Sequence, residues 1–280
     1  MKPICTVLLV TYNHAPYIEK SIESVLSQKT SYPYVIKIFD DASTDGSSDI
    51  IRKYAKKYPN KIKAFIADKN MGAQANIWRA YKSVDTKYCC YMETDDYWCN
   101  DNKLQMQIEA LEQNPNCSFC CTNNVVHVIA DKYLKEKDGK KEITEGIFKK
   151  NIITLSDIEK ISAGFYGHIT TRMIRSSAMQ LDTLRHKESF LFDSAQFLYL
   201  MTKGNMYWID KVCSVYVKTG KGTCSSADVG KRLNAFQRAM IDLNEDTNLK
   251  IWRKITQQLI LVSDFWLTKE EERKIHLNKL

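Results

Sequence analysis

The 280-residue sequence lacks the segments that would carry it into or across a membrane. No window approaches the roughly 20 consecutive apolar residues that a membrane-spanning helix requires. The apolar run from Thr6 to Val10 is too short for a signal peptide, and no small-residue cleavage site follows it. We interpret this run as a first core strand. The expected location is therefore the cytoplasm, with the inner face of the membrane as an alternative.

Glycine-rich phosphate-binding loops are missing as well. The chain has only 10 glycines and contains neither G-x-G-x-x-G nor G-x-x-x-x-G-K-[ST]. These absences exclude a dinucleotide fingerprint and a Walker loop. Phosphate groups on a ligand would have to be neutralised by a metal ion and basic side chains instead.

Signatures of zinc, disulfide and nucleic-acid chemistry are also absent. The cysteine count, nine, is odd, and several cysteines stand inside apolar runs, where a thiol behaves as a small hydrophobe. Cys117 and Cys120 have the spacing of half a zinc site, but no matching Cys or His pair follows. The net charge of +8 comes without a zinc-finger or ribonucleoprotein motif, so we expect no nucleic-acid partner. A phosphate-bearing substrate or an anionic membrane face explains the charge better.

The first 125 residues alternate between strand and helix patterns. Continuous apolar runs, typical of strands covered on both faces, are separated by segments with apolar residues every three or four positions, as on one face of a helix. This alternation predicts an α/β fold, a Rossmann-like and mostly parallel sheet flanked by helices. We expect Ser47 to cap the second helix. The expected strands are 6–10, 35–39, 62–67, 88–92 and 118–128.

Two acidic clusters follow the second and fourth of these strands. They are Asp40-Asp41 and Glu93-Thr94-Asp95-Asp96. Ligands bind beyond the carboxyl ends of parallel strands, so both clusters should face one site. Carboxylates repel, which favours a Mg²⁺ or Mn²⁺ ion held by one or two aspartates and a diphosphate. Turn and cap roles remain the alternative for either pair alone.

The order and spacing of several motifs together resemble glycosyltransferase family 2. The resemblance covers residues 4 to about 125 and continues weakly to about 226. It implies a GT-A fold over 1–226, with a nucleotide-sugar-binding half (1–125), an acceptor-binding half (126–226) and a C-terminal helical region (227–280). The motifs are Thr11-Tyr12-Asn13, Gln28, Asp40-Asp41-Ala42-Ser43-Thr44-Asp45, Glu93-Thr94-Asp95-Asp96-Tyr97-Trp98, Lys103-Leu104 and Gln107.

The resemblance implies a nucleotide-sugar site along this edge of the sheet. Asp41 would contact the base or the ribose, beside a base pocket lined by the end of the first strand. Asn70 and Asn76 would position loops beside the nucleotide, although cap or turn roles for them stay equally open. The residues expected to bind the nucleotide sugar are Val10, Thr11, Tyr12, Asn13, Asp40, Asp41, Asn70, Asn76, Glu93, Thr94, Asp95 and Asp96.

The same resemblance assigns the metal. Glu93-Thr94-Asp95 stands where the family carries its D-x-D motif, so Asp95 would bind Mn²⁺ or Mg²⁺ and Asp96 would assist or take over. Glu93 departs from the aspartate of that motif. His14 and His168 are more easily interpreted as structural than as acid or base groups. Trp98 could stack on a sugar ring or pack under the acidic loop.

The resemblance also assigns a base and shows a departure. Family members place an aspartate at the start of a helix in the second half, where Asp193 stands here. It would take the proton of the acceptor hydroxyl, with helix capping as the alternative role. A later segment that often reads Tyr-Arg-x-His in the family has Val217 and Thr219 at the Arg and His positions, after Tyr216. What replaces those contacts is left open; Lys218 and Lys221 are candidates to neutralise the diphosphate.

The implied reaction is inverting transfer of a hexosyl or hexosaminyl group from a nucleoside-diphosphate sugar, with UDP as the expected carrier. The acceptor would be a hydroxyl of a saccharide or lipid-linked saccharide in cell-surface polysaccharide or glycan synthesis. A metal-dependent nucleotidyltransferase and a non-catalytic nucleotide-sugar-binding protein are the alternatives. The basic C-terminal stripes allow peripheral contact with a membrane, packing on the core, or a homo-oligomer.

Overall fold

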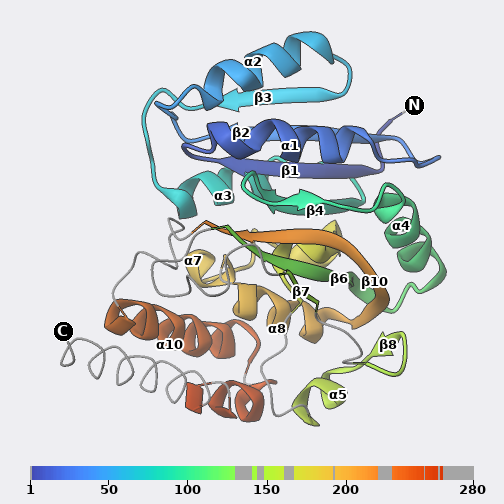
Figure 1. Cartoon of the computed structure of the whole chain (residues 1–280). Coiled ribbons are helices and arrows are strands. Elements are labelled where there is room, and N and C mark those ends of the chain that lie inside the picture. The colour runs from blue at the N-terminus through green and yellow to red at the C-terminus, as the bar shows by residue number, and fades with distance from the viewer. Residues whose placement is uncertain are drawn as a thin grey trace.

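The computed structural model describes residues 2–129, 141–143, 148–160, 167–191, 193–219, 229–248, 250–257 and 259–260. Its strands form one ten-stranded sheet in the order β3-β2-β1-β4-β9-β6-β10-β5, with β7 beside β6 and β8 beside β10. Helices cover both faces of this sheet (Figure 1). The mixed α/β architecture with a large, mostly parallel sheet confirms the predicted fold class.

The first half of the chain builds the parallel part of the sheet, in which β1 lies between β2 and β4 and β2 pairs with β3. The five expected strands are each observed within one or two residues of their expected ranges, whereas the short strand Tyr97–Trp98 was not expected. The elements are β1 (Cys5–Thr11), α1 (Ala15–Leu26), β2 (Tyr34–Asp40), α2 (Ser47–Lys57), β3 (Ile62–Ile66), α3 (Ala73–Lys82), β4 (Tyr88–Glu93), β5 (Tyr97–Trp98), α4 (Lys103–Gln113) and β6 (Cys117–Val128).

The second half extends the sheet. Strand β9 runs antiparallel to both β4 and β6, whereas β10 runs parallel to β6. The elements are β7 (Lys141–Ile143), β8 (Ile152–Ile153), α5 (Leu155–Lys160), a 3-10 turn (Ile169–Thr171), β9 (Arg172–Arg175), α6 (Ser176–Met179), α7 (Lys187–Phe190), α8 (Asp193–Lys203), β10 (Asn205–Lys218) and α10 (Val229–Asp246). The polar segment 132–141, whose Asp138-Gly139 pair predicts an exposed loop or hairpin tip, lies outside the described residues except for Lys141.

Strand β1 shows why the apolar runs are continuous. Successive side chains of a strand point to opposite faces, so Val7 and Leu9 pack with α1 and α4, whereas Leu8 and Val10 pack with α3 and α8. All four are buried. Because both faces are covered, the strand needs no polar alternation, and the sheet edge becomes the place where polar side chains gather.

One detail of the sequence prediction was wrong. The cap of α2 is Gly46, which has a positive φ of 97°, and no side chain caps this helix. Ser47 lies inside the first turn, where its hydroxyl donates to Asp45 and accepts the His14 N–H. Ser47 therefore links α2 to the loop after β1 instead of capping the helix.

Helix α10 packs on the sheet-bound helices. Ala239, Met240 and Leu243 are buried in the same core cluster as α8. No described helix has the length and apolar character that crossing a membrane would need. The described cysteines form no disulfide, and all of them except Cys99 are buried.

Candidate active site

The register of the sheet brings the two acidic clusters to adjacent strand ends. Thr11 of β1 pairs with Asp40 of β2, and Val10 pairs with Glu93 of β4. The Asp41 N–H donates to the Thr11 carbonyl at 3.1 Å, and the Thr94 N–H donates to the Val10 carbonyl at 3.1 Å. Both clusters are thus fixed on either side of the end of β1, as the strand-end argument predicts.

Asp40 builds the loop that follows β2. It is fully buried, and its carboxylate accepts the hydroxyls of Ser43 and Ser48 at 2.5 Å each. Asn13, at φ 57°, accepts the Thr44 N–H with its side-chain oxygen. These bonds tie the loop after β2 to the loop after β1. Contact of Asp40 or Asn13 with a nucleotide remains a prediction.

Asp41 holds a second loop, which leads into α3. Its carboxylate accepts the N–H groups of Met71 and Gly72 at 2.8 and 2.9 Å. Gly72 has φ +90°, a conformation that side chains rarely adopt. The Asn70 side chain accepts the Gly72 N–H at 3.0 Å, and the buried Asn76 donates to the Phe39 carbonyl. These contacts position the loop; direct binding of a nucleotide by the same residues stays a prediction.

We expect Asp41→Ala to lower the free energy of unfolding by about 2–4 kcal/mol, because two backbone N–H groups lose a charged acceptor. Urea denaturation of wild type and variant measures this difference. Asp68→Ala, which removes an exposed carboxylate from the neighbouring loop, is the control and should change stability by less than about 0.5 kcal/mol. Equal stability of Asp41→Ala and wild type would contradict the loop-anchoring role.

Arg79 is a residue of this edge that the sequence prediction missed. Its guanidinium donates to the carbonyls of Asp40 and Phe65 and to the side chain of Asn76, at 2.8–3.1 Å. Its buried Nε has no hydrogen-bond partner among the described residues. An arginine in an amphipathic helix normally faces solvent, so the sequence held no signal for this contact.

The predicted base pocket combines an exposed ring with a buried hydroxyl. Tyr12 is 45% exposed, so its ring is accessible to a ligand. Thr11 is buried, and its hydroxyl has no hydrogen-bond partner in the described part of the chain. Thr94 is also buried and faces His14, whose Nδ1 lies 3.0 Å from its hydroxyl. Tyr12 is thus the most accessible of these residues, and contact of Thr11, Tyr12 or Thr94 with a nucleotide remains a prediction.

The cluster after β4 concentrates negative charge. Glu93 is exposed at the surface. Partial loss of hydration and the charges of Asp95 and Asp193 nevertheless raise its pKa to about 7. Burial also raises the pKa of Asp95, and burial together with the Asp95 charge raises that of Asp96. The ionised cluster is therefore unfavourable without a cation nearby.

The donor atoms of this cluster suit a divalent ion. Asp95 Oδ1 is buried and has no hydrogen-bond partner among the described residues. Asp96 Oδ1 already accepts the Val217 N–H at 2.8 Å, which makes Asp96 the weaker candidate. In the part of the chain that the structure describes, no three His, Cys, Asp or Glu side chains converge on one metal position. Mg²⁺ or Mn²⁺ bound here would therefore need oxygens from a ligand such as a diphosphate.

The raised pKa of Glu93 predicts how stability changes with pH in the absence of divalent ions. Between its ordinary pKa of 4.5 and about 7, the folded protein holds a proton that the unfolded chain has released, so stability falls as pH rises through this window. Glu93→Gln should make this decline shallower. Melting temperatures in EDTA from about pH 5 to about pH 8 measure both slopes. Equal slopes would show that Glu93 does not titrate in this range.

Asp193 reaches the acidic cluster from a distant part of the sequence. It is the first residue of α8, and its charge raises the pKa values of Glu93, Asp96 and His168. The sequence placed it at the start of a helix, and the structure adds its electrostatic influence on the acidic cluster after β4. Its role as a base remains a prediction.

His168 belongs to the same region, and its side chain caps the 3-10 turn by accepting the Thr170 N–H, in keeping with the structural role that the sequence favoured. Its Nδ1 lies 3.8 Å from Asp96 Oδ2, and its ring stacks on Tyr216 at 4.1 Å between centroids. Burial lowers its pKa to about 4, so the ring is neutral near pH 7. Its connection to Asp96 crosses strands and has no signal in the sequence.

The backbone of the segment after Tyr216 contacts the acidic cluster that follows β4. Val217 stands where the family often has arginine, but its N–H binds Asp96. The charge of Lys218 lowers the pKa of His168, which places this lysine near the site; Lys221 lies outside the described residues. Trp98 packs under the acidic loop, since it is 4% exposed and its Nε1 donates to the Thr170 carbonyl.

The fold and this acidic edge define the class of the protein. A mostly parallel sheet flanked by helices, with acidic pairs following β2 and β4, is a GT-A fold, and solved GT-A structures superpose on it. The family follows from the sequence: the model of Glycosyl transferase family 2 matches residues 6–178, and the chain belongs to that family.

Individual relatives agree with this assignment. The putative teichuronic acid biosynthesis glycosyltransferase TuaG of Bacillus subtilis is 34% identical over 121 residues, 43% of this chain and 46% of TuaG, so the match spans less than half of that relative. S. aureus TarS 1–349 in complex with UDP-GlcNAc has a TM-score of 0.61 at 18% identity, covering 86% of this chain and 66% of that one. Mannosyltransferase PcManGT from Pyrobaculum calidifontis, in complex with GDP-Man and Mn²⁺, has a TM-score of 0.59 at 14% identity, covering 97% of this chain and 76% of that one.

Proposed function

We propose that this protein transfers a sugar from a nucleoside-diphosphate sugar to a hydroxyl group, with inversion at the anomeric carbon. The observation that carries the proposal is the meeting of three carboxylates at one sheet edge. Glu93 and Asp95 come from the end of β4, and Asp193 comes from the start of α8, 100 positions later in the chain. In a member of this family, that arrangement suits a metal-bound diphosphate beside a base.

The donor is proposed to be a UDP-sugar carrying a hexosyl or hexosaminyl group. The name of the TarS complex supports UDP, whereas the PcManGT complex contains GDP-Man and Mn²⁺. Asp95, assisted by Asp96, would hold Mn²⁺ or Mg²⁺ here. The ion would supply positive charge to the departing diphosphate.

Asp193 is proposed to act as the base. Its carboxylate takes the proton of the acceptor hydroxyl while the hydroxyl oxygen forms a bond to the anomeric carbon. The bond from that carbon to the diphosphate oxygen breaks on the opposite face, so the configuration inverts. Asp193 as a simple helix cap is the competing role, and loss of activity on substitution separates the two.

The acceptor is proposed to be a saccharide or a lipid-linked saccharide in cell-surface polysaccharide synthesis. The name of TuaG, a relative assigned to teichuronic acid biosynthesis, supports this class. Trp252 is 56% exposed between the exposed cations Lys250 and Arg253, which suits contact with an anionic inner membrane face. Sedimentation with anionic liposomes tests this location: no binding at low salt would rule it out.

The function is tested by incubating the protein with Mn²⁺ and a panel of UDP-, GDP- and dTDP-sugars, and measuring nucleoside diphosphate release. Release from one sugar nucleotide above the rate without enzyme is expected, and EDTA should stop it. Release of pyrophosphate from a nucleoside triphosphate and a sugar phosphate would instead show a nucleotidyltransferase. Binding of a sugar nucleotide without any release or transfer would show a non-catalytic binding protein.

A further inference from the structure

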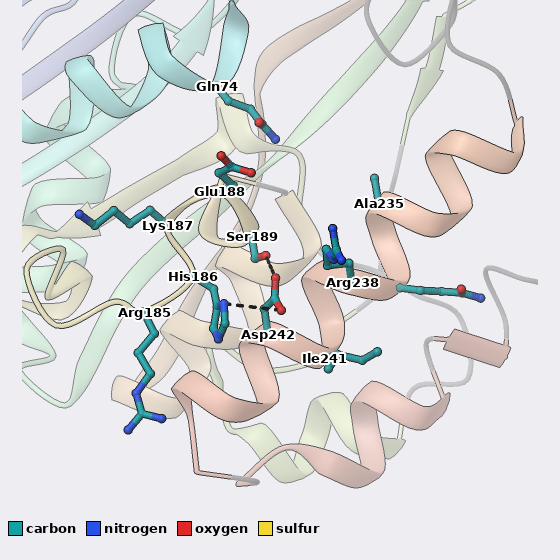
Figure 2. Close-up of a pocket in the computed structure, with 11 residues that line it drawn as sticks. Gln74, Arg185, His186, Lys187, Glu188, Ser189, Ala235, Arg238, Ile241 and Asp242 are labelled. Atoms are coloured by element: carbon teal, nitrogen blue, oxygen red, sulfur yellow. Dashed lines mark hydrogen bonds and ion pairs between the residues drawn. The ribbon is translucent and has the colours of Figure 1, made fainter.

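A groove lies between the start of α3, the segment 185–189 and helix α10 (Figure 2). Its volume is about 1090 Å³. Glu93, Asp95 and Asp193 do not line it, so the groove is distinct from the proposed metal and base positions. Pockets for single small ligands span about 300–1,000 Å³, so this groove has room for a ligand of more than one ring.

The groove leads toward the proposed base. A smaller hollow of about 460 Å³ shares Gln74, Lys187 and Glu188 with the groove. The hollow is also lined by Gly72, which Asp41 holds, and by Leu191, two residues before Asp193. One end therefore opens near Asp193 and the donor-side loop, while the other follows α10.

One wall of the groove is held in place by hydrogen bonds. Ser189 donates to Asp242 at 2.5 Å, and the two ring nitrogens of His186 face Asp242 at 3.6 Å and Glu245 at 3.0 Å. Asp242 stands between Ser189 and His186, so Ser189 has no adjacent base and the three do not form a hydrolytic triad. These contacts fasten α10 to the segment that precedes Asp193 and keep the wall rigid.

Several polar side chains that line the groove have no protein partner. Among them, Gln74, Glu188 and Arg238 are exposed, and their side chains make no hydrogen bond or ion pair among the residues that the structure describes. Gln74 and Glu188 lie on one side and Arg238 on the facing helix, whereas Arg185 extends away (Figure 2). Lys187 is directed to the smaller hollow, where its Nζ lies 5.6 Å from the centre of the Trp78 ring. An amide, a carboxylate and a guanidinium offer the mixed donors and acceptors that sugar hydroxyls require. This lining favours a saccharide over a polyanion.

We infer that this groove is the acceptor site and that its occupant is an oligosaccharide of two or more sugar residues. Gln74, Glu188 and Arg238 hold the hydroxyls of its inner residues, and its terminal hydroxyl extends past Leu191 toward Asp193. Trp78, which lines the smaller hollow, adds an apolar face for a sugar ring. The inference rests on the proposed function, and it assigns to α10 a direct part in substrate binding.

The test offers saccharides of one to six residues to the protein as acceptors. Each reaction contains Mn²⁺ and, in labelled form, the sugar nucleotide that the protein turns over. Wild type should label saccharides of two or more residues in preference to monosaccharides. With the best acceptor, Glu188→Gln and Arg238→Gln should each raise the acceptor KM at least about tenfold, the loss of about 1.4 kcal/mol of binding. Affinity for UDP and kcat should stay within about twofold. Arg52→Gln, which changes an exposed arginine of α2 outside the groove, is the matched control.

Preference for monosaccharides, labelling of none of the saccharides, or an unchanged acceptor KM in both groove variants would overturn the inference. Failure of the proposed function has a different signature, in which no sugar nucleotide is consumed. In that case, binding of the same saccharides to the protein in the absence of a donor tests the groove independently of sugar transfer. Saccharide binding that Arg238→Gln loses and Arg52→Gln keeps supports it; equal binding by both variants overturns it.

Discussion

Asp193→Asn should lower the rate of sugar transfer by about 10²–10⁴-fold, the range that a positioned general base contributes. The substitution keeps the size of the side chain and its capacity to accept a hydrogen bond at the start of α8, but it cannot take a proton. The predicted readout is a loss in kcat with little change in the donor KM. Steady-state kinetics with the identified donor and acceptor measure both parameters.

The control for this prediction is Asp182→Asn. Asp182 is exposed and pairs with Lys82 on the surface, so its substitution should leave transfer near the wild-type rate. A purely helix-capping Asp193 would predict a retained kcat and an unchanged melting temperature in Asp193→Asn, because asparagine caps a helix about as well as aspartate does. That pattern would assign the residue to structure and remove it from the reaction.

Asp95→Ala should remove metal-dependent transfer by about 10³-fold or more, because a divalent ion at a leaving diphosphate is worth several kcal/mol. Asp95 Oδ1 is a buried carboxylate oxygen without a hydrogen-bond partner among the described residues, so removal of this atom breaks no hydrogen bond. One negative charge leaves a repulsive cluster, and the melting temperature without metal should stay the same or rise. Activity and thermal melting together measure this prediction.

Raising the Mn²⁺ concentration separates metal binding from other causes of the loss. Asp101→Asn, which removes an exposed carboxylate paired with Lys29, is the control and should require no more Mn²⁺ than wild type. An Asp95→Ala protein with wild-type turnover and an unchanged Mn²⁺ requirement would contradict the assignment of the metal to this residue.

The fold of the first 125 residues could be predicted from the sequence because its signals are local. Strands buried on both faces give continuous apolar runs, and β1, β2 and β4 begin and end near the predicted residues. Residues that follow neighbouring parallel strands lie at the same edge of the sheet, so Asp40-Asp41 and Glu93-Asp95 were expected to meet there. The motif order then sufficed to identify the family.

The rest of the site depends on contacts between distant segments. The insertion of β9 between β4 and β6 brings His168 to Asp96, and neither sequence pattern nor spacing reports that approach. Arg79 links β2, β3 and α3 only because those elements pack together; the sequence pattern alone predicts a surface residue. The proposed acceptor groove needs α10 beside the segment before Asp193, a contact that apolar periodicity cannot specify.

The most direct test of the central claim, that the acidic edge binds a nucleoside diphosphate through a divalent ion, is calorimetric titration of UDP with and without Mn²⁺. Wild type should bind UDP at least about tenfold more tightly with Mn²⁺. Asp95→Ala should lose that difference while keeping the weaker, metal-independent binding through the base pocket. Equal affinity of wild type for UDP with Mn²⁺ and with EDTA would contradict the account.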